Sequence, residues 1–337
     1  MDSFINQFPK VELHTHLNGC IREETLKKWH KNPNITTTID KILSPTSTSE
    51  ESLSNCFVVF DLIYEATTTL DRIKQLTTEV LEDYDNDNAI IVEIRTTPRA
   101  LENLSQRDYV NSVVFAIKKY LNNRTKQTPF YPYLLLSINR SRLSSAHETI
   151  LLAEEFKKTT PFVKGIELSG NPFKGNWQEI CELMNDAKKR GLGVTMHIGE
   201  KVDDDEAKHL LSCGPSRVGH GVFLSKENVD LMNQFGMACE VCLTSNIVSK
   251  SITEYSKHPR MSGEFTGTKL ICCDDRGIFR TSLDKEVTHA VKAYCKNDVD
   301  SKKFVRGLCL NGIKESYLDD DVKLSLTRYV ESLPDFG

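Results

Sequence analysis

The sequence lacks any long apolar stretch, because a charged residue interrupts each hydrophobic run well before the about 18 residues that a membrane-spanning helix needs. Its N-terminus also lacks the basic segment followed by an apolar segment that marks a secretory signal. Neither positive nor negative charge dominates, since the sequence has 47 acidic and 43 basic residues. We therefore expect a cytoplasmic protein without a membrane segment and without the basic face of a nucleic-acid binder.

Cysteine is present ten times, but without the spacing of a disulfide framework, and in a cytoplasmic protein we expect free thiols. The C-x-x-C pair Cys239 and Cys242 lies in an expected strand, where residues three apart face opposite sides. Adjacent Cys272 and Cys273 also face opposite sides, so these four cysteines are not expected to hold zinc. The sequence has no P-loop, G-x-S-x-G or protein-kinase motif.

Short apolar and β-branched runs alternate with longer stretches of helical periodicity. The expected strands are 11–17, 89–96, 133–139, 165–169, 193–197, 217–221, 237–243 and 269–274. Helices are expected at 105–121, 145–158, 176–190, 204–211 and 226–235. This alternation predicts an α/β fold, the (β/α)8 TIM barrel, over a single domain of residues 1–337. A doubly wound sheet is the alternative, but no G-x-G-x-x-G follows the first strand.

Two segments depart from this rhythm. Residues 32–55 are rich in Thr, Ser and Pro and precede a helical stretch to about residue 85, so the first connection carries a large helical insertion. Insertions at this end of a barrel often cap the site. Residues 298–334 are expected to form extra C-terminal helices outside the barrel.

Several histidines and acids fall near the expected carboxyl ends of strands, where barrel enzymes place their catalytic groups. His14 and His16 lie two apart on one strand and so point to one side, while His197, His220 and Asp274 follow other strands. Nitrogen ligands with a carboxylate suit a divalent ion, zinc by default. The alternative is that each histidine is an isolated, hydrogen-bonded structural residue.

Glu200 follows His197 in the sequence MHIGE and would reach over the mouth of the barrel. Beside Lys201 it can be read as a solvated loop acid. Together with the histidines it becomes a candidate for general acid–base catalysis.

Four segments carry a family resemblance: FPKVELHTHLNG at 8–19, MHIGE at 196–200, RVGHG at 217–221 and CCDD at 272–275. Their order and spacing resemble the signature blocks of the adenosine deaminase family, a mononuclear-zinc branch of the amidohydrolases. HLNG in place of HLDG, with EIRTTPR at 93–99, is similar to the subgroup that deaminates N6-methyl-AMP to IMP.

The resemblance implies one zinc per chain, held by His14, His16, His197 and Asp274. It implies that Glu200 donates a proton to purine N1, that His220 orients the attacking water, that Asp275 contacts the ring near N7 and that the Gly170 N–H faces N3. The implied substrate contacts are His16, Asn18, Tyr64, Thr96, Thr97, Pro98, Arg99, Asn139, Gly170, His197 and Asp275. Tyr64 and Asn139 depart from the His and Asp that the subgroup often has at these positions.

The chemistry is also coherent without the family name. The amine leaves a purine only after C6 becomes tetrahedral, and zinc supplies the nucleophile for that attack. Protonated Glu200 lets the ring accept electrons, so we expect burial to raise its pKa. His220 can either take a proton from the water or hold the water in line. Only one metal is expected, because the fourth strand, GIELSG at 165–170, lacks the lysine that bridges two metals. The H-x-E and P-C-x-x-C motifs of the other zinc deaminase fold are absent.

Phosphate recognition rests on two features. Neutral Asn18 avoids the repulsion that an Asp would impose on a 5′-phosphate. Thr96, Thr97 and Arg99 follow the second strand and can converge on the anion, although the same residues can be read as a helix-capping turn.

We therefore expect a monomeric zinc hydrolase that converts N6-methyl-AMP and related N6-substituted purine 5′-monophosphates to IMP plus an amine, methylamine in the first case. One alternative is a deaminase of unphosphorylated adenosine or adenine. A second is a non-catalytic, zinc-containing purine-binding protein.

Overall fold

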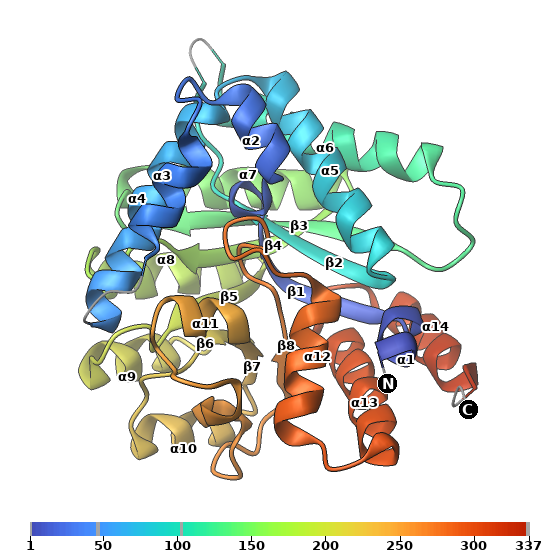
Figure 1. Ribbon diagram of the computed structural model, residues 1–337. Coiled ribbons are helices and arrows are strands. Elements are labelled where there is room, and N and C mark those ends of the chain that lie inside the picture. Colours follow the sequence, from blue (N-terminus) through green and yellow to red (C-terminus); the bar gives the residue numbers. More distant parts are fainter. Residues whose placement is uncertain (1, 45–47, 102–103, 335–337) are drawn as a thin grey trace.

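The computed structural model describes residues 2–44, 48–101 and 104–334, and its centre is one sheet of eight parallel strands in sequence order (Figure 1). A bridge between Thr15 and Asp274 joins the first strand to the segment after the last. There the Asp274 N–H donates to the His14 carbonyl at 2.9 Å. The predicted (β/α)8 barrel is confirmed. The strands are β1 (Lys10–His16), β2 (Ala89–Thr96), β3 (Tyr131–Asn139), β4 (Val163–Ser169), β5 (Gly193–Ile198), β6 (Arg217–His220), β7 (Ala238–Val241) and β8 (Lys269–Ile271).

The last two strands are shorter than predicted. Residues 237–243 were expected to be extended, but α11 (Leu243–Val248) begins within that range. Likewise β8 ends at Ile271, and the segment to Asp274 makes only the isolated bridge to β1. The apolar residues are buried both in the strands and in the segments that follow them. Hydrophobicity alone therefore could not predict where each strand ends.

Helices cover the outside of the sheet, and polar residues set where they begin. Ser105 and Asp108 form a capping box at the start of α6, and Asn176, Asp203, Ser225 and Ser282 each accept a backbone N–H at the start of a later helix. The helices around the sheet are α6 (Gln106–Asn123), α7 (Ala146–Thr159), α8 (Trp177–Lys189), α9 (Asp204–Ser212), α10 (Lys226–Gln234) and α12 (Leu283–Tyr294), and only α7 among them lacks a side-chain cap.

The insertion after β1 is more helical than predicted. It contains η1 (Asn18–Cys20), α2 (Glu23–Trp29), α3 (Ile35–Ile42), α4 (Ser49–Ala66) and α5 (Leu70–Asn86). The helical stretch predicted to about residue 85 is present as two helices, because Thr48 and Thr69 cap α4 and α5 separately. Buried Ile35 and Ile39, four residues apart, give the Thr-rich stretch a helix that composition did not suggest. Residues 45–47 of the predicted cap lie outside the described residues.

The predicted C-terminal helices are confirmed as α13 (Asp298–Glu315) and α14 (Asp320–Ser332). They lie outside the barrel near α1 (Asp2–Gln7), as Figure 1 shows. At Gly312, α13 passes so close to β1 that an added Cβ would stand 2.5 Å from the Cβ of Val11. Three further short helices are η2 (Leu143–Ser145), η3 (Tyr255–Lys257) and η4 (Pro259–Met261).

The interior of the barrel contains a buried network of paired charges: Glu93, Arg95, Arg217 and Glu240, all fully buried. Glu240 Oε1 accepts from Arg95 Nη2 at 2.6 Å and from Arg217 Nε at 2.7 Å. Arg217 Nη2 also donates to Glu93 Oε2 at 2.6 Å. Each charge thus has an opposite partner, which burial in a low-dielectric interior requires.

The expectation that every cysteine is a free thiol is wrong for two residues. Cys181 of α8 and Cys213, which follows α9, form a disulfide with their Cα atoms 5.7 Å apart. They lie 32 residues apart in sequence, and only the packing of α8 beside α9 brings them together. The other eight cysteines are free. Among the described residues, no helix combines the length and the apolar character that crossing a membrane would demand.

Candidate active site

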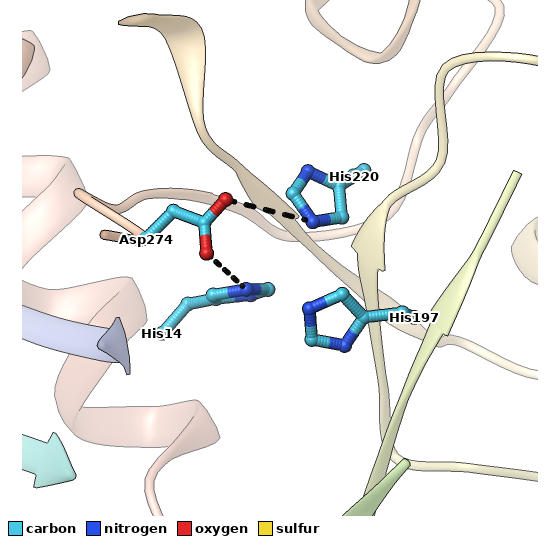
Figure 2. A group of neighbouring side chains, drawn as sticks. All are labelled: His14, His197, His220 and Asp274. Carbon is cyan, nitrogen blue, oxygen red and sulfur yellow. Dashed lines mark ion pairs between the residues drawn. The ribbon is translucent and has the colours of Figure 1, made fainter. Parts of the chain in front are cut away.

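The carboxyl ends of β1, β5, β6 and β8 bring together side chains that could hold a metal ion. Potential ligand atoms of His14, His197, His220 and Asp274 lie within 4.8 Å of one another (Figure 2). His16 lies in a second such group, with Glu167 and His197. The convergence predicted from the sequence is therefore present.

The distances distinguish His16 from His220. His16 Nε2 lies 3.3 Å from His14 Nε2, 3.2 Å from His197 Nε2 and 3.4 Å from Asp274 Oδ1. His14 Nε2 is also 3.4 Å from Asp274 Oδ1. A tetrahedral ion with bonds of about 2.0–2.1 Å holds its ligand atoms about 3.3–3.4 Å apart, so these four distances are compatible with one shared ion. His220 Nε2 lies farther out, 3.9 Å from Asp274 Oδ2.

Neighbouring groups orient these imidazoles. His14 Nδ1 lies 2.7 Å from Glu240 Oε2, and His197 Nδ1 lies 2.9 Å from the Leu168 carbonyl. Each acceptor fixes the proton on Nδ1 and leaves Nε2 available as a ligand atom. Burial lowers the pKa of His16 to about 3 and the pKa of His197 well below its ordinary value, so both rings are neutral.

The backbone beneath the site adopts conformations that are unusual for residues with side chains. His220 and Asp274 have φ of 62° and 65°, in the left-handed region. Such conformations are costly and concentrate at functional sites. Gly19 allows Asp275 to approach closely, since a Cβ on Gly19 would stand 1.7 Å from Asp275 Oδ1.

Two acids near the cluster are held in the protonated form. Burial, together with the negative charge of Asp274, raises the pKa of Glu200 to about 8, as expected from the sequence. Burial and the neighbouring Asp274 carboxylate also raise the pKa of Asp275 well above its ordinary range. Glu200 Oε1 lies 3.8 Å from His220 Nε2. Both acids can therefore donate a proton or a hydrogen bond at neutral pH.

These groups line a cavity of about 310 Å³ at the mouth of the barrel. Most of the residues proposed from the sequence lie on its wall: His16, Asn18, Tyr64, Thr96, Thr97, Asn139, Gly170, His197, Glu200, His220, Asp274 and Asp275. His14 lies behind the wall and is fully buried.

Pro98 and Arg99 do not line this cavity. The Arg99 guanidinium instead donates to the carbonyl and to the hydroxyl of Thr67, and it lies over the ring of Tyr64 at 4.4 Å. Thr67 Oγ1 in turn donates to Asn18 Oδ1 at 3.1 Å. Arg99 is thus connected to the cavity through Thr67 and Asn18.

Comparison with known proteins agrees with this geometry. The sequence profile described as adenosine deaminase matches residues 9–333. This chain belongs to the adenosine deaminase family. Within the family, it is 35% identical to an adenosine deaminase-like protein of Drosophila pseudoobscura pseudoobscura, with 99% of each chain covered, and 32% identical to the N6-mAMP deaminase of Arabidopsis thaliana, with 96% of each covered. A crystal structure of the Arabidopsis N6-mAMP deaminase superimposes with a TM-score of 0.87 at 31% identity, covering 98% of this chain and 100% of that one.

As a member of the adenosine deaminase family, the protein is a deaminase, and the family is metal-dependent. The candidate catalytic side chains lie at the carboxyl ends of the strands, which is where barrel enzymes place their active sites.

Several residues on the wall of this deaminase site were not identified from the sequence. Four come from α4 and give the mouth an apolar side: Leu53, Cys56, Phe57 and Phe60. Arg142, after β3, is a cavity-lining cation that is exposed. Ser245 and Asn246 of α11 also line the cavity, and Ser245 Oγ donates to Asp274 Oδ2 at 2.7 Å. The spacing of the α4 residues, at intervals of three and four, was the signal that could have revealed that face.

Proposed function

We propose that the protein hydrolyses N6-methyl-AMP, and related N6-substituted purine 5′-monophosphates, to IMP and the free amine. The observation that carries this proposal is a cluster of three imidazoles and one carboxylate, with four distances of 3.2–3.4 Å among their atoms, beside protonated Glu200 in a cavity of about 310 Å³. The named N6-mAMP deaminases of Arabidopsis thaliana and Mus musculus, 32% and 35% identical, support the choice of substrate. A related Arabidopsis structure described as a complex with IMP matches with a TM-score of 0.87.

We propose one zinc ion per chain, held by His14, His16, His197 and Asp274. Three imidazole nitrogens and a carboxylate oxygen suit zinc, and the distances between their atoms are compatible with it. When bound there, zinc supplies Lewis-acid chemistry that makes water nucleophilic near neutral pH.

The chain's own residues then position the purine. Glu200, protonated at neutral pH, donates to purine N1, which allows C6 to become tetrahedral. Protonated Asp275 donates to N7 on the other side of the ring, and the Gly170 N–H faces N3. His220 directs the reacting oxygen toward C6 from beside Glu200, 3.8 Å away.

We propose that the sugar and phosphate extend toward β2 and β3, where Tyr64, Asn18, Thr96, Thr97 and Asn139 lie on the cavity wall. His16 and His197 contact the reacting end of the substrate as well as the metal. Arg142 adds a positive charge at this end, and Pro98 and Arg99 support the wall from behind.

A comparison of substrates tests the proposal. Zinc-loaded protein is offered N6-methyl-AMP, AMP and adenosine side by side, and loss of purine absorbance, release of methylamine and metal content are measured. We expect the highest kcat/KM for N6-methyl-AMP, with about one zinc per chain. Preference for adenosine would favour the unphosphorylated alternative, and no turnover of any of the three by zinc-loaded protein would overturn the proposal.

A further inference from the structure

A chain of buried hydrogen bonds leads from a backbone amide to His220. It begins at η4, where the Arg260 N–H donates to His258 Nδ1 at 3.2 Å. A backbone amide can only donate, so His258 Nδ1 carries no proton. Burial, with His220 and Arg260 as neighbours, lowers the pKa of His258 to about 3, and the ring is therefore neutral. Its one N–H must be at Nε2.

That proton determines the orientation of Asn246. His258 Nε2 lies 3.2 Å from Asn246 Oδ1 and donates to it. The amide nitrogen of Asn246 must then face the other way, where it lies 3.3 Å from His220 Nδ1. An amide NH₂ only donates, so His220 Nδ1 is the acceptor. Neutral His220 consequently carries its proton on Nε2.

His220 Nε2 points into the active site, 3.8 Å from Glu200 Oε1 and 3.9 Å from Asp274 Oδ2 (Figure 2). We propose that Asn246 and His258 are positioning residues that hold His220 as the Nε2–H tautomer. His220 then donates a hydrogen bond to the reacting oxygen, and the proton that this oxygen loses passes to solvent and not to His220. The inference rests on the proposed function for its chemical meaning. The sequence left two roles open for His220, taking a proton from the water or holding the water in line, and the inference favours the second.

The surroundings make this arrangement hard to reverse. His220, Asn246 and His258 are each 2–3% exposed, so no bulk water competes for their polar atoms. Reversing the Asn246 amide would place NH₂ against the Nε2–H of His258 and leave both donors without an acceptor. An unpaired buried donor costs about 1–3 kcal/mol. The direction of every bond therefore follows from the Arg260 backbone N–H.

The tautomer can be measured directly in the unmodified protein. Nitrogen-15 NMR of metal-loaded protein with labelled histidine separates protonated from unprotonated ring nitrogens among the nine histidines. The signals that disappear in a His220→Asn variant identify His220. We expect a proton on Nε2 and none on Nδ1. A proton on Nδ1 would overturn the inference, whatever the catalytic activity is.

Substitution of Asn246 tests the consequence for catalysis. In Asn246→Asp the carboxylate accepts from both neighbours, which moves the His220 proton to Nδ1. We expect kcat for N6-methyl-AMP to fall about 100- to 1000-fold, as on loss of an oxyanion donor, with KM changed less than about threefold. Metal content should not change. A kcat within about threefold of the unmodified protein would contradict the inference.

His258 offers a matched pair of variants. Gln at this position keeps an N–H that can reach Asn246 Oδ1, whereas Phe keeps a ring of similar size without one. We expect His258→Gln to retain at least about tenfold more kcat than His258→Phe at comparable thermal stability. Equal losses in the two would indicate a packing role only. If the protein turned over none of the purines tested, the NMR result would still decide the tautomer, so the two proposals fail separately.

Discussion

Burial of the Glu200 carboxyl beside Asp274 sets a limit on the pH range of the reaction. Its pKa is raised to about 8, and the protonated form is the one that donates to purine N1. We therefore expect kcat/KM to stay level below about pH 8 and to fall about tenfold per pH unit above it, as a pH–rate profile would record. A rate that rises through pH 8 would contradict this role.

Replacement of the same carboxyl separates proton transfer from metal binding. Glu200→Gln keeps the size and a hydrogen-bond donor but cannot transfer a proton. We expect kcat to fall by about 10²–10⁴, while metal analysis still finds the ion, because Glu200 is outside the four-residue ligand set. A variant with full activity would instead favour a non-catalytic binding protein.

Two arginines near the phosphate end are expected to differ in their effects. Arg142 lines the cavity, whereas Arg99 is bound to Thr67. In Arg142→Ala we expect KM for the nucleotide to rise at least about tenfold, with KM for adenosine nearly unchanged, since only the nucleotide has the anion. Arg99→Ala should give a smaller rise with the same selectivity. The control is Arg107→Ala, because Arg107 is exposed and paired with Glu155. Equal effects on nucleotide and nucleoside would refute the phosphate assignment.

At the scale of elements, α4 has two faces with different tasks. Val59 is fully buried against the body of the protein, while Phe57 is half-buried and lines the cavity. We expect Val59→Ala to lower the free energy of unfolding by about 2 kcal/mol with little change in KM. Phe57→Ala should raise KM severalfold with a smaller loss of stability. Chemical denaturation and steady-state kinetics measure the two quantities in both variants. Equal changes in stability and in KM in the two variants would contradict the separate roles of the two faces.

The disulfide between α8 and α9 is a second feature at this scale. Closing a chain segment of 32 residues stabilises a fold by about 2–4 kcal/mol through restriction of the unfolded chain. We expect Cys181→Ser to lower the thermal midpoint relative to Cys295→Ser, which replaces a free cysteine. Thiol titration of denatured, unreduced protein should give eight thiols. Ten thiols would mean that the bond does not form.

At the scale of the whole molecule, the metal site joins strands that are distant in sequence. Its proposed ligands come from β1, from β5 and from the segment after β8, across the bridge that closes the barrel. A ligand that binds only the folded state stabilises it, by about 2.7 kcal/mol at a hundredfold excess over its Kd. We expect chelation to abolish activity and to lower the thermal midpoint, and zinc to restore both. An unchanged midpoint would argue against a metal held between these strands.

We also propose that residues 1–337 act as one domain, as the uninterrupted sheet order suggests. One cooperative unfolding transition for the metal-loaded protein is then expected. The buried charges Glu93, Arg95, Arg217 and Glu240 support this, since they link β2, β6 and β7 across the interior.

Sequence periodicity predicted one strand to the residue and misplaced the ends of other elements. β2 has the predicted bounds, 89–96, because its apolar run is bounded by polar residues on both sides. β7 was extended wrongly into Leu243, because strand and helix bury apolar residues equally well there. In the insertion, Thr69 was not recognised as a helix cap, so the boundary between α4 and α5 was not predicted.

The sequence by itself determined the alternation of strand and helix, and hence the barrel, and it identified the histidines and acids that lie near its mouth. The alternation of elements and these candidate residues are encoded locally, in periodicity and in short motifs. Only the tertiary structure decided that Cys181 meets Cys213, that Arg142 and not Arg99 lines the cavity, and that a backbone N–H at Arg260 fixes the proton on His220. These pairings depend on how elements pack, and residues far apart in the chain leave no local pattern by which to predict them.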